Sequence, residues 1–185
     1  MNVHMKMLLA ALALTASAPL AAQEILWSEE FDEGTAPDER VWSYDLGSGG
    51  WGNFELQEYT DSPDNVRVEN GHLVITALPV ETTGGGLRFT SARIRTEDKL
   101  IFRYGTIEAR IQVPDLADGL WPAFWTLGNN FSEVGWPFCG ELDIMEMGNS
   151  SAIADGVINR RVGSTAHWDN EGTKVDYGLY LDAPQ

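Results

Sequence analysis

The sequence predicts an all-β fold, arranged as an antiparallel β-sandwich. Helix signals are nearly absent, whereas short segments with alternating apolar and polar residues recur along the chain. Turn-forming stretches rich in Gly, Pro, Ser and Asp separate these segments, at residues 47–50, 62–64, 84–86 and 114–119. Short strands at this spacing are typical of sandwiches rather than of parallel sheets with crossover helices.

Strands are expected, in chain order, at residues 25–27, 66–68, 73–77, 87–94 and 106–113. The second and third follow one another around a turn at Asn70-Gly71, a dipeptide that favours tight hairpins. The last has the clearest alternation, with Ile107 and Ile111 on a face expected in the core and Glu108 and Arg110 on the other.

The N-terminal segment, residues 1–22, reads as a secretory signal peptide. Lys6 precedes an apolar run at residues 7–14, and small residues follow up to Ala22, so cleavage is expected before Gln23. The run is too short to span a membrane. We therefore expect a secreted or periplasmic protein with one domain at residues 23–185 and no membrane partner.

The part after this segment is strongly acidic. The chain has 28 acidic and 12 basic residues, and the segment holds one Lys, so 28 acids face 11 bases, a net charge of −17. This charge argues against a nucleic-acid partner and, more weakly, against a sulfated polysaccharide. The single cysteine, Cys139, excludes an internal disulfide. Separately, the protein is expected to be a monomer.

Seven Trp residues are present, and several lie beside turns. They can be core residues, or they can bind sugars, because the C–H faces of sugar rings pack on aromatic planes.

Residues 141 to 146 read Glu-Leu-Asp-Ile-Met-Glu, which places three carboxylates among bulky apolar side chains. The pattern indicates a strand with acids on one face and Leu142 and Ile144 buried on the other. On a helix, Glu141 would turn away from the other two acids. On a regular strand Glu146 would face the opposite side, and one inserted residue, a β-bulge at Ile144-Met145, would return it to the face of Glu141 and Asp143.

With this bulge the Cα atoms of Glu141 and Glu146 would lie roughly 13 Å apart. On a concave sheet their side chains can lean inward, toward the ~5–5.5 Å carboxyl separation of retaining glycosidases. Asp143 would lie between them and raise a neighbour's pKa.

These residues resemble the active-site signature of glycoside hydrolase family 16, in the form with one extra residue that is typical of laminarinase-like endo-β-1,3-glucanases. Six further blocks match that family in order, at residues 51–60, 90–94, 104–110, 121–125, 135–137 and 163–168. The resemblance covers most of residues 25–168. It implies a concanavalin-like jelly roll and a β-glucan polysaccharide as substrate.

The resemblance implies Glu141 as the nucleophile and Glu146 as the general acid/base, with Asp143 assisting on the nucleophile side. No cofactor is expected for catalysis. Positions that usually line the sugar subsites are matched by Asn53, Arg93, Trp121, Trp125, Trp136 and His167. Two of them have a structural alternative, since Arg93 can form an ion pair inside the sheet and Asn53 can be a turn residue.

A structural calcium is also implied, with Glu30 and the carbonyl of Gly71 as ligands. The late-strand Asp that usually completes the set is not found. The family's domain is usually longer than this chain, so the last strands are expected to be missing. Either the chain is a fragment of a longer enzyme, or it is a short, unstable and inactive product; in both cases open edges and exposed apolar faces are expected.

Three functions remain open at this stage. The first is a secreted endo-β-1,3-glucanase, and the second is a non-catalytic β-glucan-binding module. The third is a family 16 enzyme with lichenan, agarose or transglycosylase specificity, for which the extra Met145 argues against a lichenase.

Overall fold

The computed structural model describes residues 24–116 and 119–184, and the chain divides into two units, Met1–Glu30 and Phe31–Gln185. The described part of the first unit, residues 24–30, has no helix or strand. The strand predicted at residues 25–27 is therefore wrong, because an extended segment becomes a strand only with a hydrogen-bonded partner. The predicted signal peptide lies outside the described residues. The calcium site stays a prediction, since Glu30 belongs to the first unit and Gly71 to the second.

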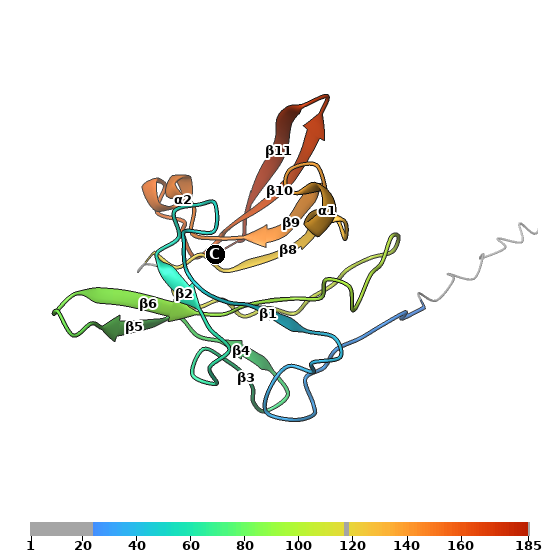
Figure 1. The fold of residues 1–185 in the computed structure, drawn as a ribbon. Coiled ribbons are helices and arrows are strands. Elements are labelled where there is room, and N and C mark those ends of the chain that lie inside the picture. Colours follow the sequence, from blue (N-terminus) through green and yellow to red (C-terminus); the bar gives the residue numbers. More distant parts are fainter. Residues whose placement is uncertain (1–23, 117–118, 185) are drawn as a thin grey trace, which may run out of the picture. The chain divides into compact units, whose positions relative to one another are not determined.

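The second unit contains a four-stranded antiparallel sheet with the order β11-β10-β9-β8 (Figure 1). Its strands are β8 (Ala123–Leu127), β9 (Glu141–Glu146), β10 (Arg161–Asn170) and β11 (Thr173–Asp182). β10 and β11 pair over their full length and form a hairpin closed by Glu171 and Gly172, both with positive φ. β9 pairs with β10 only from Gly163 to His167, so the tip of the hairpin extends beyond β9.

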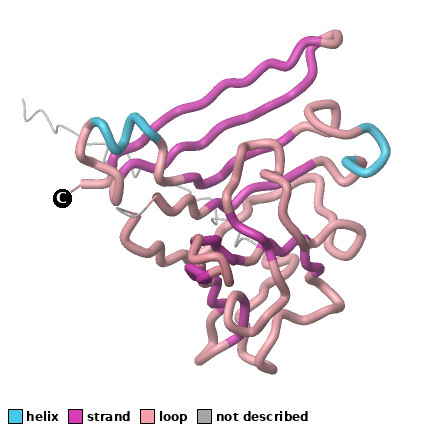
Figure 2. Tube along the Cα trace, turned by 60° about the vertical axis from the view of Figure 1, so that its left-hand side comes forward, coloured by secondary structure: helices cyan, strands magenta, loops and turns pink. Residues whose placement is uncertain are grey.

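Seven shorter strands form three further sheets, and long loop stretches connect them (Figure 2). β1 (Ser43–Asp45) pairs with β7 (Arg93–Arg95), β3 (Val66–Val68) pairs with β4 (Leu73–Ile75), and β6 (Leu87–Ser91) lies between β2 (Gln57–Tyr59) and β5 (Leu78–Glu81). β2 and β6 are parallel, so the antiparallel prediction is wrong for this pair. The chain between them contains β3, β4 and β5, which is long enough for the crossover that parallel strands need.

The hairpin predicted around Asn70-Gly71 is confirmed. Glu69 and His72 exchange two backbone hydrogen bonds, and both central residues have positive φ, the conformation of a type I′ turn. The two helices are short, α1 (Phe131–Val134) and α2 (Ser150–Ala154), and the side chain of Asn149 caps α2 by accepting a hydrogen bond from the Ala152 amide. Neither is long and apolar enough to span a membrane.

The strand predicted at residues 106–113 is wrong. No regular structure forms there, and Ile107 and Ile111, which were expected in the core, are exposed. The alternation is present in the sequence, but no described segment pairs with this one. Without a ladder and a covering layer, an alternating pattern produces neither a strand nor a buried face.

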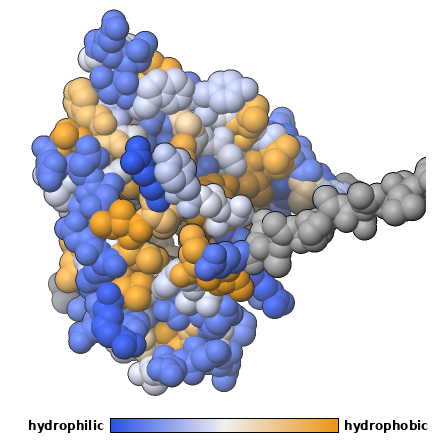
Figure 3. All heavy atoms as spheres, turned by 90° about the vertical axis from the view of Figure 1, so that its right-hand side faces the viewer, coloured by the Kyte–Doolittle hydropathy of each residue, from blue (hydrophilic) through white to orange (hydrophobic). Residues whose placement is uncertain are grey.

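The face of the four-stranded sheet opposite the three acids is also uncovered in the described part of the chain. Leu142 is 57 % exposed, so the prediction that it is buried is wrong, whereas Ile144 is half-buried. Leu179 and Leu181 on β11 are exposed as well. The expected exposed apolar faces are thus present, and apolar patches are visible between hydrophilic side chains in Figure 3.

Candidate active site

The acidic strand β9 contains the predicted β-bulge. Asp143 lies opposite Trp125 of β8, but Met145, two residues later, lies opposite Phe124, which is adjacent to Trp125. The ladder with β10 shows the same insertion, since Asp143 pairs with Thr165 and Glu146 pairs with Gly163. One extra residue at Ile144 therefore shifts the alternation of the strand.

The bulge places Glu146 on the face that carries Asp143 and Glu141. Opposite them on β10 lie Gly163, Thr165 and His167, which alternate along a regular strand and so share one side. The prediction that the three acids lie on one face is confirmed by this register.

A hydrogen bond from Ser164 holds the bulge. Its Oγ donates to the carbonyl oxygen of Ile144 at 2.8 Å, which ties β10 to the bulged residue. Ser164→Ala should lower the free energy of unfolding by about 1 kcal/mol, measured by denaturant titration. The matched control is Ser48→Ala in an exposed loop, which should be neutral; equal values for the two variants would contradict a role of Ser164 at the bulge.

Asp143, Glu141 and His167 form a compact cluster. Nε2 of His167 lies 3.2 Å from Oδ2 of Asp143 and 3.9 Å from Oε1 of Glu141. Asp143 is 6 % exposed, and this burial, together with the charge of Glu141 and a hydrogen bond between the two carboxyls, raises its pKa to about 6. The proximity of His167 acts in the opposite direction. Asp143 can thus hold a proton in weakly acidic solution and donate it in a hydrogen bond to Glu141.

This raised pKa makes the stability of the protein depend on pH. Because the pKa of Asp143 is higher in the folded state than its ordinary value of 3.8, the folded state binds more protons between pH 4 and 6, and stability falls as the pH rises. The difference between a pKa of about 6 and one of 3.8 corresponds to about 3 kcal/mol. The free energy of unfolding of Asp143→Asn minus that of wild type should therefore be more positive at pH 7 than at pH 4.

Denaturant unfolding at both pH values measures this effect. Asp64→Asn, a change of an exposed aspartate in a turn, is the control and should show the same difference from wild type at both pH values. An Asp143→Asn profile parallel to that of wild type would contradict the assignment.

Glu146 lies in a different environment from Glu141. Burial raises its pKa, while the indole Nε1 of Trp121 donates a hydrogen bond to its Oε1 at 2.9 Å and acts in the opposite direction. A carboxyl with a raised pKa suits a general acid, because it keeps its proton nearer to neutral pH.

Arg93 connects two sheets through aromatic side chains. Its guanidinium lies 4.6 Å from the ring centroid of Trp125 on β8 and 5.0 Å from that of Trp51. Its Nε also lies 2.9 Å from Oδ2 of Asp45, so the ion pair that was considered as a structural alternative is present. The ion pair holds Arg93 near the two rings, and a role of Arg93 in a sugar subsite stays a prediction.

The two remaining predicted subsite residues, Trp136 and Asn53, lie in different surroundings. The ring of Trp136 lies 5.9 Å from that of His167, next to the Glu141 end of the cluster, and Nζ of Lys174 lies 4.7 Å from the Trp136 centroid. Asn53 instead lies exposed in a turn, where its backbone amide donates a hydrogen bond to the carbonyl of Gly50. The Asn53 side chain forms no hydrogen bond with the described residues. The structure thus agrees with the turn alternative for Asn53.

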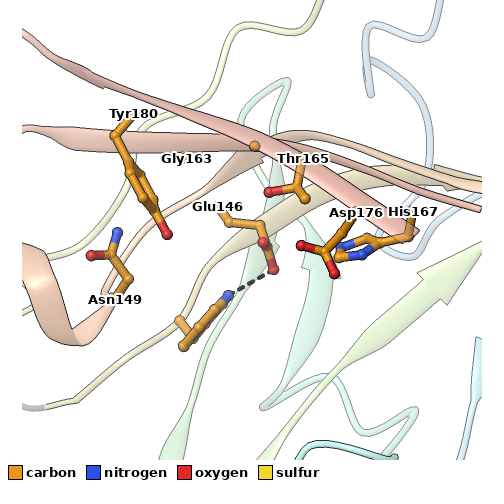
Figure 4. Close-up of a pocket in the computed structure, with 9 residues that line it drawn as sticks. Glu146, Asn149, Gly163, Thr165, His167, Asp176 and Tyr180 are labelled. Atoms are coloured by element: carbon orange, nitrogen blue, oxygen red, sulfur yellow. Dashed lines mark hydrogen bonds between the residues drawn. The ribbon is translucent and has the colours of Figure 1, made fainter. Parts of the chain in front are cut away.

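A cleft of about 380 Å³ opens beside Glu146 (Figure 4). Three of its lining residues were predicted as site residues, namely Trp121, Glu146 and His167. Sequence reasoning did not select the others, which include Asn149, Thr165, Asp176 and Tyr180. Several of them could have been found from the register of the β10–β11 hairpin, because this register brings alternate β11 residues to the face of His167.

Comparison with known proteins supports the resemblance. A family profile described as beta-glucan synthesis-associated protein SKN1/KRE6/Sbg1, which is related to glycoside hydrolase family 16, matches residues 25–138. The laminarinase catalytic domain from Thermotoga maritima has 43 % sequence identity and a TM-score of 0.70, over 88 % of this chain and 63 % of that chain. A Bacteroides ovatus mixed-linkage glucan GH16 structure has 34 % identity and a TM-score of 0.73, over 87 % of this chain and 65 % of that one. The chain belongs to glycoside hydrolase family 16.

A further relative defines how much of a family 16 protein this chain represents. The beta-glucanase of Rhodothermus marinus is 40 % identical over 144 residues, which are 75 % of this chain and 49 % of that protein. The chain thus spans about half the length of this relative and less than two thirds of the two solved chains. The all-β jelly-roll fold class is confirmed by these matches.

In the described residues, one group of at least three His, Cys, Asp or Glu side chains is compact enough to hold a metal ion. The possible ligand atoms of Glu141, Asp143 and His167 lie within 4.8 Å of one another. Calcium prefers six to eight oxygen ligands, and an imidazole nitrogen does not suit it. The donor set of this cluster therefore does not fit calcium.

Proposed function

We propose that the protein hydrolyses β-1,3-glucan with net retention, using Glu141 as the nucleophile and Glu146 as the general acid/base. The bulge at Ile144 carries this proposal, because it brings both carboxylates to one face of the sheet. The environments of the acids support their different roles. Glu146 is held by Trp121 beside an open cleft, whereas Glu141 contacts Asp143 and His167.

The proposed reaction has two steps. In the first, Glu146 donates its proton to the glycosidic oxygen while Glu141 attacks the anomeric carbon, and the bond to the leaving sugar breaks. In the second, Glu146 removes a proton from water, the water oxygen bonds to the anomeric carbon, and the ester to Glu141 breaks. The proton on Asp143 supports the second step, because a hydrogen bond from it stabilises Glu141 as the departing carboxylate.

Groups on both sides of β9 are suited to hold the polysaccharide. On the β8 side, the guanidinium of Arg93 lies near the rings of Trp125 and Trp51, and on the β10 side lies the cleft beside Glu146. Aromatic planes bordered by polar side chains suit the C–H faces and hydroxyls of a glucan.

The stereochemical course tests the proposal. Proton NMR during laminarin hydrolysis should show the β-anomer of the new reducing end first, followed by slower mutarotation. Initial appearance of the α-anomer would contradict the double displacement. Laminarin binding without any new reducing ends would instead support a non-catalytic glucan-binding module.

The preferred glycan is decided by the same kind of assay. We propose laminarin-type glucan, and a reducing-sugar screen over laminarin, lichenan, agarose and carrageenan tests this choice. The highest kcat/KM on laminarin is expected, and a higher value on lichenan or agarose would assign one of the alternative family 16 specificities.

We also propose that the protein is secreted or periplasmic, on the basis of the sequence of residues 1–22. N-terminal sequencing of the exported protein should identify Gln23 as the first residue, and a protein that retains residue 1 after fractionation would contradict this.

A further inference from the structure

The cleft lies on one side of the catalytic strand. Glu146 lines it, whereas Glu141 and Asp143 do not. Because the proposed acid protonates the oxygen that leaves, the space in the cleft beside Glu146 receives the leaving sugar, and later the acceptor. The cleft volume of about 380 Å³ lies within the range of small-molecule sites.

Tyr180 lies in this cleft, in line with the proposed acid. Glu146 pairs across the sheet with Gly163 of β10, and Gly163 pairs with Tyr180 of β11, so the three residues follow one another across three strands. Figure 4 shows the Tyr180 ring and Glu146 on the same side of the sheet. The ring is 60 % exposed and is available to a ligand.

Gly163 allows this placement of the ring. A Cβ atom at residue 163 would lie 3.0 Å from Cε1 and 3.3 Å from Cδ1 of Tyr180, tighter than ordinary contacts. The ring thus lies against the backbone of β10, where a Cβ atom would push it aside by a few tenths of an ångström. The ring atoms nearest to Gly163 are thus Cε1 and Cδ1, on one side of the ring.

A second glycine, Gly178, leaves space in the cleft because it has no side chain. A Cβ atom at Gly178 would lie 2.9 Å from Oγ1 of Thr165, so a larger residue would fill the space next to Tyr180. Polar side chains border it, with Asn149 near Tyr180 and Asp176 near His167 (Figure 4). One aromatic plane bordered by amide and carboxylate groups is the chemistry that recognises a sugar ring.

We infer that Tyr180, positioned by Gly163, is the stacking platform for the sugar on the leaving-group side, and that it determines how well an acceptor glucan competes with water. This inference rests on the proposed function. In the transfer reaction, a hydroxyl of the bound acceptor attacks the anomeric carbon of the glycosyl ester on Glu141. Glu146 takes the hydroxyl proton, a new glycosidic bond forms, and the ester bond breaks to release the Glu141 carboxylate.

The test uses an aryl β-laminaribioside as the donor and laminaribiose as the acceptor, with transfer and hydrolysis products separated by chromatography. Tyr180→Ala should raise the acceptor concentration needed for half-maximal transfer about three- to tenfold, the range expected for loss of one aromatic stacking contact. Tyr180→Phe should behave like wild type, and Gly163→Ala, which shifts the ring, should fall between wild type and Tyr180→Ala.

The matched control is Tyr177→Ala, since Tyr177 lies on the same strand with similar exposure but on the opposite face. It should leave transfer unchanged. Equal acceptor dependence in Tyr180→Ala and Tyr177→Ala would overturn the inference.

A binding measurement separates this inference from the proposed function. Calorimetric titration with laminaribiose should show a Kd about three- to tenfold higher for Tyr180→Ala than for wild type. Failure of wild type to release the aryl group would refute the proposed function alone, provided that binding still depends on Tyr180. Binding that does not depend on Tyr180 would refute the platform even in an active enzyme.

Discussion

Replacing Glu141 with Gln should reduce kcat on laminarin by at least about 10⁴-fold, because an amide cannot form the covalent ester that the double displacement requires. The fold should be retained, since Glu141 is half-buried and the isosteric amide can still contact His167. Thermal unfolding and laminarin binding close to wild type would show that the loss is chemical.

Two further variants sharpen this result. Glu133→Gln, the same substitution at an exposed residue of α1, should keep full activity. Glu141→Ala with added azide should form the α-glycosyl azide, because azide then attacks the face that the carboxylate has left open. A Glu141→Gln enzyme within tenfold of the wild-type kcat would contradict the assignment of the nucleophile.

Glu146→Gln should lower kcat on laminarin by about 10²- to 10⁴-fold, the usual contribution of a general acid/base. The effect should depend on the leaving group. With a dinitrophenyl laminaribioside, whose leaving group needs no proton, the first step should proceed nearly as in wild type. The second step should be slow, because water is no longer deprotonated.

The expected time course is a burst of dinitrophenolate of about one equivalent, followed by a slow phase that azide accelerates, since azide needs no general base. The azide product should be the β-anomer, opposite to that of Glu141→Ala. A variant without a burst, equally impaired on laminarin and on the activated substrate, would show that Glu146 is not the acid/base.

The acidic strand illustrates what the sequence could predict. The spacing of Glu141 and Glu146 across Met145 is incompatible with regular alternation, so a bulge followed from the requirement that both acids face one sugar. The observed register shift at Ile144 confirms it. The hairpin at Asn70-Gly71 was equally predictable, because that dipeptide adopts positive φ at low cost.

The failures have a common physical origin. Alternation at residues 106–113 and the apolar Leu142 predicted buried faces, but burial depends on a second layer that no local pattern encodes, and the described chain leaves these residues exposed. The parallel pairing of β2 and β6 likewise depends on a long-range crossover. Tyr180 was missed because its role follows from its cross-strand partner Gly163 rather than from its own neighbours in sequence.

Trapping the covalent intermediate tests the central claim, that bulged β9 supplies a nucleophile at Glu141 and an acid/base at Glu146. A 2-deoxy-2-fluoro laminaribiosyl donor with an activated leaving group should inactivate the enzyme and add one glycosyl mass. Peptide mass spectrometry should locate this mass on Glu141. Modification of another residue, or turnover of the donor with no covalent species at any pH, would contradict the account.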